Sequence, residues 1–438
     1  MLERFWSAAA QGQAMAEGRL DPVELAESYL EAAEPRHDVY ARLTADRARF
    51  EAMAARTRLL DGLGRSPLDG VALSWKDLFD SAGTVTEAGS LLLAGRVPNE
   101  DAEVLRQASL AGTVCLGKTH MTELAFSGLG LNPNTATPPN AVTRGLAPGG
   151  SSSGAAVSVK LGLAAAAVGS DTGGSVRIPA AWNDIVGLKT THGRVSTRGV
   201  VPLCKRFDTV GPLARTVEDC ALVLAALEGT KAPDLRGATL DGARLLVLDG
   251  LPFDSIREAP ARGFESAVAK LARAGATVEH MALPMVSPAM DLSGILFAPE
   301  AYGLWHDTIE AAPEKMYPLI LQRFRGGAQI SAAVYVKGWD DLARHRAEFY
   351  AATAGYDAVL VPTAPILPPD ALRLLTDAAY FETENLLALR NTRLANIFGL
   401  CALTLPTGEP MCGLSLMGKP MREEALLRLG MAVEAALG

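Results

Sequence analysis

Apolar and polar residues follow two patterns along the chain, one with helical spacing and one of short continuous apolar runs. Residues 21–24 (Asp-Pro-Val-Glu) form a capping box that predicts a helix start, and helical spacing continues behind it. Further helices are predicted at 103–111, 155–163, 217–227, 263–274 and 421–437. Apolar runs predict strands at 71–76, 113–118, 164–170, 243–250 and 357–365. Alternation of this kind is typical of α/β layers.

These elements predict a single large α/β/α domain over 1–438, with a central mixed β-sheet covered by helices on both faces. Residues 1–65 are expected to be helical, and 66–230 to form the core of the domain. The irregular, aromatic stretch 285–345 is interpreted as a helical cover near the active site. The long Asn/Pro/Gly-rich loop 128–150 has the length of a functional loop.

Composition and charge narrow the class of protein. The 438 residues are 49% hydrophobic and carry a net charge of −8, which argues against nucleic acid or an anionic membrane as a partner. Five cysteines without CxxC spacing argue against a disulfide framework and a structural metal site. The amino terminus carries charges where a signal peptide needs an apolar run. We therefore expect a soluble, cytoplasmic protein.

Two glycine-flanked serine clusters carry the candidate chemistry: GGSSSG at 149–154 and DTGGS at 171–175. A serine becomes a nucleophile when a base takes its proton and N–H groups receive the developing oxyanion. No histidine pair has ligand or catalytic spacing, so Lys76 is the candidate base. Its apolar neighbours would lower its pKa by desolvation. An ion pair with Asp77 or Asp80 is the alternative.

Two other motif matches lack the structural context that they need. Residues 112–119 satisfy GxxxxGK[ST], but the residues between the glycines are strand formers rather than a phosphate-binding loop. A P-loop nucleotide-binding protein is therefore a remote alternative. Residues 150–154 fit the GxSxG nucleophile elbow, but a loop and not a strand precedes them.

The stretch Pro148–Lys189 resembles the amidase signature family, whose defining segment has the form GGSS[GS]G, then D-x-GGS-[IV]-R-x-P, then G-x-K. The similarity extends upstream to SWKDLFD around Lys76 and to GKTHMTELAFSG at 117–128. Downstream it continues to Ala221, and more loosely to TRLANIFGLCALTLPTG near the carboxyl end. Most of the chain is covered, and a run of this length is specific.

The resemblance implies a Ser–Ser–Lys triad on Ser175, Ser151 and Lys76. Ser175 is the expected nucleophile, Ser151 the bridging serine after a cis peptide bond, and Lys76 the base. The resemblance assigns further roles to three groups of residues. These are an oxyanion hole of the Thr172, Gly173, Gly174 and Ser175 amides; loop-holding Ser152, Asp171 and Arg177; and an acyl pocket at Ala125, Phe126 and Ser127. By composition alone, Phe126 is equally compatible with the core, and an ion pair is the favoured interpretation of Arg177.

The expected activity is that of a serine amidohydrolase. Its substrates would be small aryl or alkyl amides, with carbamates and esters as further candidates, and neither a metal nor a cofactor is implied. The A subunit of a tRNA-dependent amidotransferase, which releases ammonia from glutamine, is the main alternative. The expected partners are a small amide substrate and water, with the protein a monomer or homodimer. His192 replaces a common aromatic residue and is expected at a pocket edge.

Overall fold

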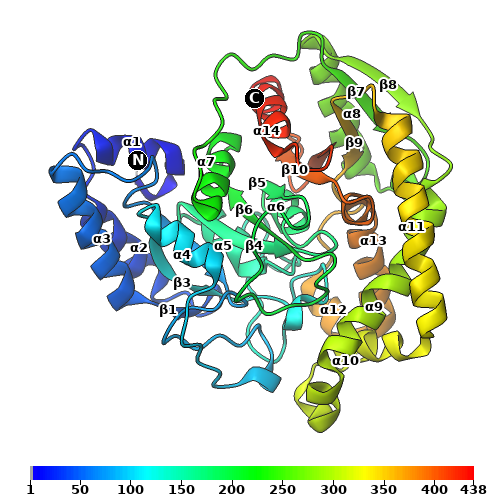
Figure 1. Cartoon of the computed structure of the whole chain (residues 1–438), viewed down its shortest axis with the longest axis horizontal. Helices are drawn as coiled ribbons and strands as arrows, with labels where there is room; N and C mark the ends of the chain where they lie inside the picture. Colours follow the sequence, from blue (N-terminus) through cyan, green and yellow to red (C-terminus); the bar gives the residue numbers. More distant parts are fainter. Residues whose placement is uncertain (1–2) are drawn as a thin grey trace.

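Within residues 3–438, which the computed structural model describes, eleven strands form one central sheet (Figure 1). In spatial order they are β1 (Tyr40–Leu43), β3 (Val114–Thr119), β2 (Ala72–Lys76), β4 (Ala166–Asp171), β6 (Thr209–Ala214), β5 (Val186–Lys189), β10 (Cys401–Pro406), β11 (Gly413–Gly418), β9 (Ala358–Pro362), β7 (Arg244–Leu248) and β8 (Thr277–Met281).

The sheet is mixed, as predicted. Strand β2 runs parallel to its neighbours β3 and β4, and β7 runs parallel to β8 and β9, while the other pairs are antiparallel. The carboxyl ends of neighbouring parallel strands lie at the same sheet edge. Lys76, the last residue of β2, therefore lies beside the end of β4 and the serine cluster that follows it.

Helices cover both faces of the sheet. One face packs against α7 (Val217–Glu228), α8 (Glu258–Arg273) and α14 (Glu423–Leu437). The other packs against α5 (Ser153–Lys160) and α6 (Arg177–Trp182), and α13 (Ala378–Ile397) contacts α6. Because both faces are covered, every residue of β2 and β4 is buried. The predicted α/β/α architecture is confirmed.

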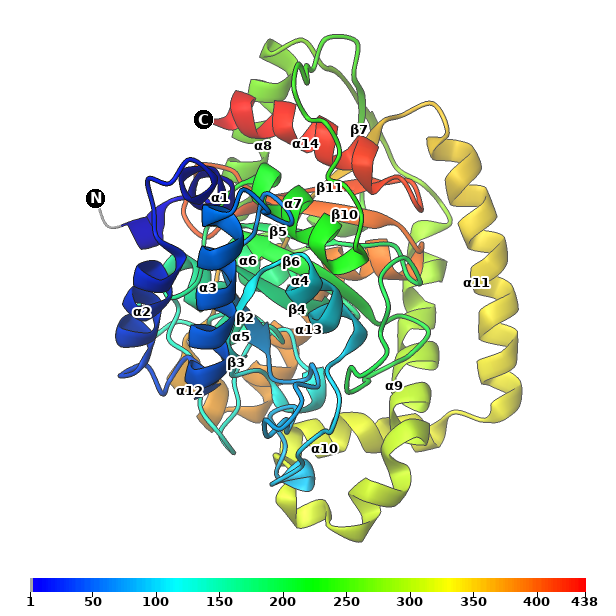
Figure 2. The same ribbon diagram turned by 60° about the vertical axis from the view of Figure 1, so that its left-hand side comes forward.

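The remaining helices lie toward the two ends of the sheet (Figures 1 and 2). Near β1 and β3 are α1 (Ala8–Ala16), α2 (Pro22–Ala33), α3 (Ala45–Leu60) and α4 (Glu103–Leu110). On the opposite side are α9 (Val286–Ala311), α10 (Pro318–Arg325) and α11 (Ala332–Thr353). The short helix α12 (Ala371–Thr376) packs against α13. Helix α2 begins as predicted, with the Asp21 carboxylate accepting hydrogen bonds from the Val23 and Glu24 amides. Among the helices of residues 3–438, none has the length and apolar character that a membrane span requires.

Two sequence-based expectations require correction. The segment 1–65 contains a strand, β1, which pairs antiparallel with β3 more than seventy residues away. Its four residues carry little pattern of their own, so the pairing depends on tertiary context. Helix α8 begins at Glu258, five residues before its predicted start. The first two residues of the segment lie outside the described range.

The P-loop-like segment 112–119 forms β3, as its strand-forming residues predict. Lys118 is fully buried, donates to the Phe79 carbonyl at 2.5 Å and lies 3.4 Å from an Asp77 carboxylate oxygen. A lysine enclosed in this way cannot reach a phosphate group. The segment is structural, and it does not form the phosphate-binding loop on which the nucleotide-binding alternative depends.

Replacing Lys118 by methionine is expected to lower the free energy of unfolding by about 3 kcal/mol, because it leaves the buried Asp77 carboxylate without its cation. Chemical denaturation measures this change. The double variant Lys118→Met/Asp77→Asn serves as the matched control and should recover part of the loss. Binding of Mg-ATP to the wild-type protein, lost in Lys118→Met, would contradict this structural role.

Candidate active site

Lys76 occupies the carboxyl end of β2, with its ammonium group enclosed by serine hydroxyls. Its Nζ lies 2.7 Å from Ser151 Oγ and 2.8 Å from Ser170 Oγ, and the side chain is fully buried. Ser170 comes from β4, and Ser151 comes from the loop before α5. Two segments about 75 and 94 residues away in the sequence therefore converge on one amine.

Burial lowers the pKa of Lys76 to about 7, an effect that the more distant Asp208 and Asp171 carboxylates oppose. The expected alternative, an ion pair with Asp77 or Asp80, is not formed. Asp77 faces Lys118, and Asp80 binds Arg96 at 2.7 Å. A substantial fraction of Lys76 is therefore neutral near pH 7 and able to accept a proton.

The buried lysine also makes stability depend on pH. The pKa of Lys76 falls from an ordinary 10.5 to about 7 in the folded protein, so between these values the unfolded chain binds more protons. Lys76 therefore makes the free energy of unfolding of the wild-type protein increase as the pH rises from 7 to 10.5. The free-energy cost of burying the Lys76 amine is largest below pH 7. The Tm of Lys76→Met minus that of wild type should be larger at pH 6 than at pH 9. A difference independent of pH would show that Lys76 titrates normally.

The Gly150–Ser151 peptide bond is cis, as the resemblance implies. Gly150 lies against Gly130 so closely that a Cβ on Gly150 would come within 2.7 Å of the Gly130 Cα. Only glycine fits this approach. Ser152 links the two serine clusters, because its amide donates to the Ser175 carbonyl at 3.2 Å.

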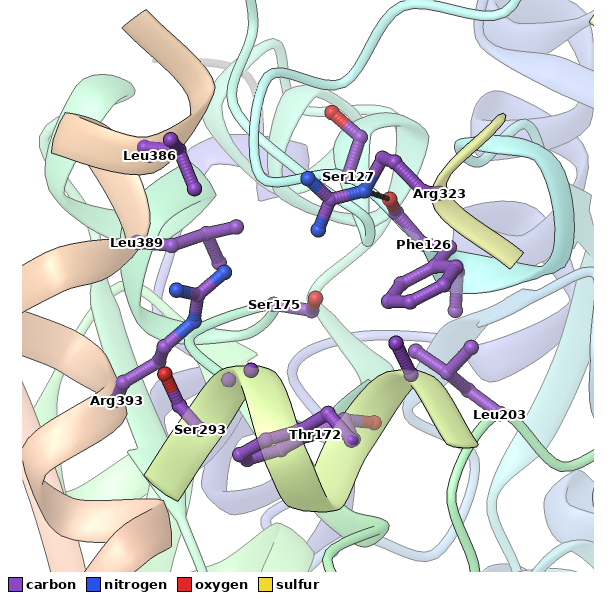
Figure 3. Close-up of a pocket in the computed structure, with 15 residues that line it drawn as sticks. Phe126, Ser127, Thr172, Ser175, Leu203, Ser293, Arg323, Leu386, Leu389 and Arg393 are labelled. Atoms are coloured by element: carbon purple, nitrogen blue, oxygen red, sulfur yellow. Dashed lines mark hydrogen bonds between the residues drawn. The ribbon is translucent and has the colours of Figure 1, made fainter. Parts of the chain in front are cut away.

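Ser175 lies in the loop that follows β4, and its hydroxyl points into a cavity (Figure 3). Among the described residues, this hydroxyl makes no hydrogen bond to another side chain. Of the two hydrogen bonds that would link the three residues of the triad, the one between Lys76 and Ser151 is therefore present and the one between Ser151 and Ser175 is not.

Asp171 organises the loop from 171 to 177. Its carboxylate accepts hydrogen bonds from the Gly174 amide at 2.8 Å and the Val176 amide at 3.2 Å, and it forms a buried ion pair with Arg177 at 2.9 Å. Burial alone would raise the pKa of Asp171, but the Arg177 guanidinium lowers it to about 2. The ion-pair interpretation of Arg177 is thus confirmed.

This arrangement corrects one member of the expected oxyanion hole. The Gly174 amide is occupied by Asp171 and is not available to a substrate. Gly174 is instead required by the backbone conformation. Its φ is +138°, and a Cβ at this position would lie 2.1 Å from Thr392 Oγ1. Among the described residues, the Gly173 and Ser175 amides donate to no protein acceptor, so they remain candidates for the oxyanion hole together with Thr172.

The same loop is held from two further sides by residues that sequence reasoning did not assign. Thr172 Oγ1 donates to Asp208 at 2.5 Å, and burial raises the pKa of Asp208 to about 6. Thr392 Oγ1 on α13 donates to the Gly173 carbonyl at 2.8 Å. Asp208 lies in the downstream family-like run FDTVGPLA and Thr392 in the stretch TRLANIFG, so a weak sequence signal existed for both.

The cavity beside Ser175 has a volume of about 300 Å³. The expected pocket residues Ala125, Phe126 and Ser127 all line it. Phe126 also packs edge-on against Phe324 of α10, with ring centroids 4.8 Å apart, so it serves both core and pocket. His192 is exposed, bonds to the Lys205 carbonyl and does not line this cavity, which corrects its expected place at a pocket edge.

Helices α9, α10 and α13 complete the cavity (Figure 3). Phe297 of α9 and Leu389 of α13 add apolar surface, while Arg323 of α10 and Arg393 of α13 add positive charge. Sequence reasoning missed both arginines. Arg393 lies in the loosely family-like stretch near the carboxyl end, whereas Arg323 lies in a region where the sequence shows only irregular aromatic pattern.

Comparison with known proteins identifies the family. The sequence model of the family named Amidase matches residues 23–427. The chain belongs to the amidase signature family. It is therefore a hydrolase of C–N bonds.

Three similar proteins show the range of this family. The chain is 37% identical over 415 residues to 2-amino-5-chloromuconic acid deaminase of Comamonas testosteroni, covering 92% of this chain and 90% of that protein. It is 33% identical over 463 residues to the A subunit of glutamyl-tRNA(Gln) amidotransferase from Anaeromyxobacter sp. (strain K), covering 95% and 92%. The structure of peptide amidase from Stenotrophomonas maltophilia superposes with a TM-score of 0.81 at 28% identity, covering 98% and 96%.

Proposed function

We propose that this amidase-family protein is a serine amidohydrolase that forms an acyl-enzyme on Ser175. The hydrogen bond between Lys76 and Ser151, next to the cavity-facing Ser175 hydroxyl, carries the proposal. On substrate binding, the Ser175 hydroxyl turns toward Ser151 and attacks the amide carbonyl carbon. Its proton passes to Ser151 as the Ser151 proton passes to neutral Lys76. The amides of Thr172, Gly173 and Ser175 receive the oxyanion.

The second half of the cycle returns the proton. Protonated Lys76 gives a proton through Ser151 to the leaving nitrogen, the C–N bond breaks, and ammonia or an amine departs. Water then loses a proton to the same relay and attacks the Ser175 ester, which releases a carboxylic acid and restores the serine. A relay with a pKa near 7 can both take and return a proton at neutral pH.

The substrate class follows from the cavity and the relatives. A cavity of about 300 Å³ suits a small acyl group rather than a polymer or a long lipid chain. One relative is named for deaminating an amino-substituted muconic acid. We therefore place small amides that release ammonia first, with carbamates and esters also accepted.

A second candidate function is the ammonia-releasing A subunit of a tRNA-dependent amidotransferase. Several relatives carry that name over more than 90% of this chain. That role requires partner subunits, whereas the first proposal concerns a monomer or homodimer. Five buried free cysteines support a cytoplasmic location for either function.

A panel of substrates that share one small acyl group tests the proposal. Primary amide, anilide, carbamate and ester are incubated with the wild-type protein alone, and products are read by mass spectrometry. The primary amide is expected to be hydrolysed with release of one ammonia per acid formed. If the protein hydrolyses none of these substrates by itself, but releases ammonia from glutamine once amidotransferase partner subunits are added, the second candidate is favoured.

A further inference from the structure

Two arginine side chains enter the cavity above Ser175 from different helices. Arg323 comes from α10 and Arg393 from α13, and both guanidinium groups point into the space that Ser175 faces (Figure 3). Neither belongs to the Lys76–Ser151–Ser175 constellation. Among the described residues, neither arginine forms an ion pair with a carboxylate, and Glu382 acts on Arg323 only from beyond ion-pair distance.

Arg323 uses only part of its hydrogen-bonding capacity within the protein. Its Nε donates to the Phe126 carbonyl at 2.9 Å, and its guanidinium carbon lies 4.7 Å from the centroid of the Phe126 ring. These contacts fix the plane of the group but leave both terminal nitrogens without a protein acceptor among residues 3–438. These two nitrogens are the pair that a carboxylate would bind.

Arg393 has even fewer hydrogen-bond partners than Arg323. Among the described residues, its side chain donates no hydrogen bond and forms no ion pair. Other enclosed arginines differ: Arg177 pairs with Asp171, and Arg346 donates to the Ile397 carbonyl at 2.6 Å. Burial lowers the pKa of both cavity arginines. For Arg323 the charge of Arg393 lowers the pKa further, and the Glu382 carboxylate opposes this effect. An enclosed cation without a partner costs folding stability, and a bound anion would remove that cost.

The cavity itself indicates which anion fits. Within the described range, none of the lining residues is acidic, and most of the remaining surface is apolar, including Leu203, Phe297 and Leu389. A guanidinium fork matches a carboxylate in a bidentate geometry. The volume of about 300 Å³ accommodates an acid of a few carbon atoms whose apolar body lies between the arginines and Ser175.

We propose that Arg323 and Arg393 bind a carboxylate of the substrate, so that the preferred substrate is a small acid that also carries the scissile amide. The proposal rests on the proposed function for the identity of the reacting group. The arginines bind one end of the molecule, and Ser175 attacks the carbonyl at the other. A neutral amide of equal length fills the same apolar space but leaves both guanidiniums unpaired.

Binding to the Ser175→Ala variant tests the inference without turnover. The probes are the monoamides of succinic, glutaric and adipic acids, each compared with the neutral diamide of the same length by calorimetry. At least one monoamide is expected to bind more than about tenfold tighter than its diamide. Adding Arg393→Met or Arg323→Met should weaken monoamide binding about 10- to 100-fold, the usual range for losing a hydrogen bond to a charged group, and leave diamide binding unchanged.

Arg325→Met is the matched control, since Arg325 lies on the same helix, pairs with Glu310 at 2.7 Å and does not line the cavity. It should bind the monoamides as the parent does. Thermal unfolding confirms that each variant is folded. Equal binding of all monoamides and diamides, or equal weakening of both by the arginine variants, would overturn the inference.

The two proposals fail in different ways. Arginine-dependent binding of monoamides without hydrolysis by the wild-type enzyme would support the carboxylate site and contradict the proposed function. Hydrolysis of neutral amides with a kcat/KM that matches the acids and is unaffected by Arg393→Met would support the proposed function and overturn the carboxylate site.

Discussion

Replacing Ser175 by alanine is expected to lower kcat/KM by about 10⁴-fold or more while leaving the fold intact. Ser175 is the serine whose hydroxyl faces the cavity, and without it no acyl-enzyme can form. The lost atom makes no hydrogen bond to another side chain in residues 3–438, so the free energy of unfolding should change by less than about 1 kcal/mol. Ammonia release and thermal unfolding measure the two effects.

The matched control is Ser196→Ala, because Ser196 is exposed and lies outside the cavity. It should retain wild-type turnover. Incubating the wild-type enzyme with an ester substrate and quenching with acid should trap an acyl adduct on the peptide that contains Ser175. An adduct on Ser151 instead, or full activity of Ser175→Ala, would show that the nucleophile is assigned incorrectly.

Lys76→Met is expected to lower kcat by about 10²- to 10⁴-fold, the usual contribution of a general base. In the wild-type enzyme, kcat/KM should rise with pH through about 7, since the burial-lowered pKa of Lys76 makes the amine neutral above that value. In the Lys76→Met variant, the remaining kcat/KM should no longer rise with pH around 7. A profile that is flat from pH 5 to 9 in the wild-type enzyme would contradict the role of Lys76 as base.

Local pattern predicted much of the fold. The strand that ends at Lys76, the β3 strand at the P-loop-like segment and the helix that begins after Asp21 all form where the sequence places them. Apolar runs and capping residues act within a few positions, so these elements are visible locally. Strand β1 was missed because four residues of mixed polarity become a strand only through pairing with β3.

The residues of the candidate site also fall into a group that the sequence predicted and a group that it did not. The resemblance to the amidase signature family assigned Lys76, Ser151 and Ser175, and it also assigned Asp171 and Arg177 in the same segment. The arginines of the cavity were not assigned, because α10 and α13 reach Ser175 only after more than a hundred residues of intervening chain have folded. Nothing in the surroundings of Arg323 along the chain distinguishes it from a surface arginine, and the family-like stretch around Arg393 does not show where its side chain lies.

The sequence by itself indicated the reaction class, because its glycine-flanked serines and the lysine at the end of an apolar strand lie in a long run that resembles the amidase signature family. Only the tertiary structure decided which groups remain available. It showed that Asp171 occupies the Gly174 amide, that Asp77 and Asp80 leave Lys76 unpaired, and that two arginines face Ser175. Hydrogen bonds and charges are satisfied in space, so the partner that each group finds depends on residues far away in the chain.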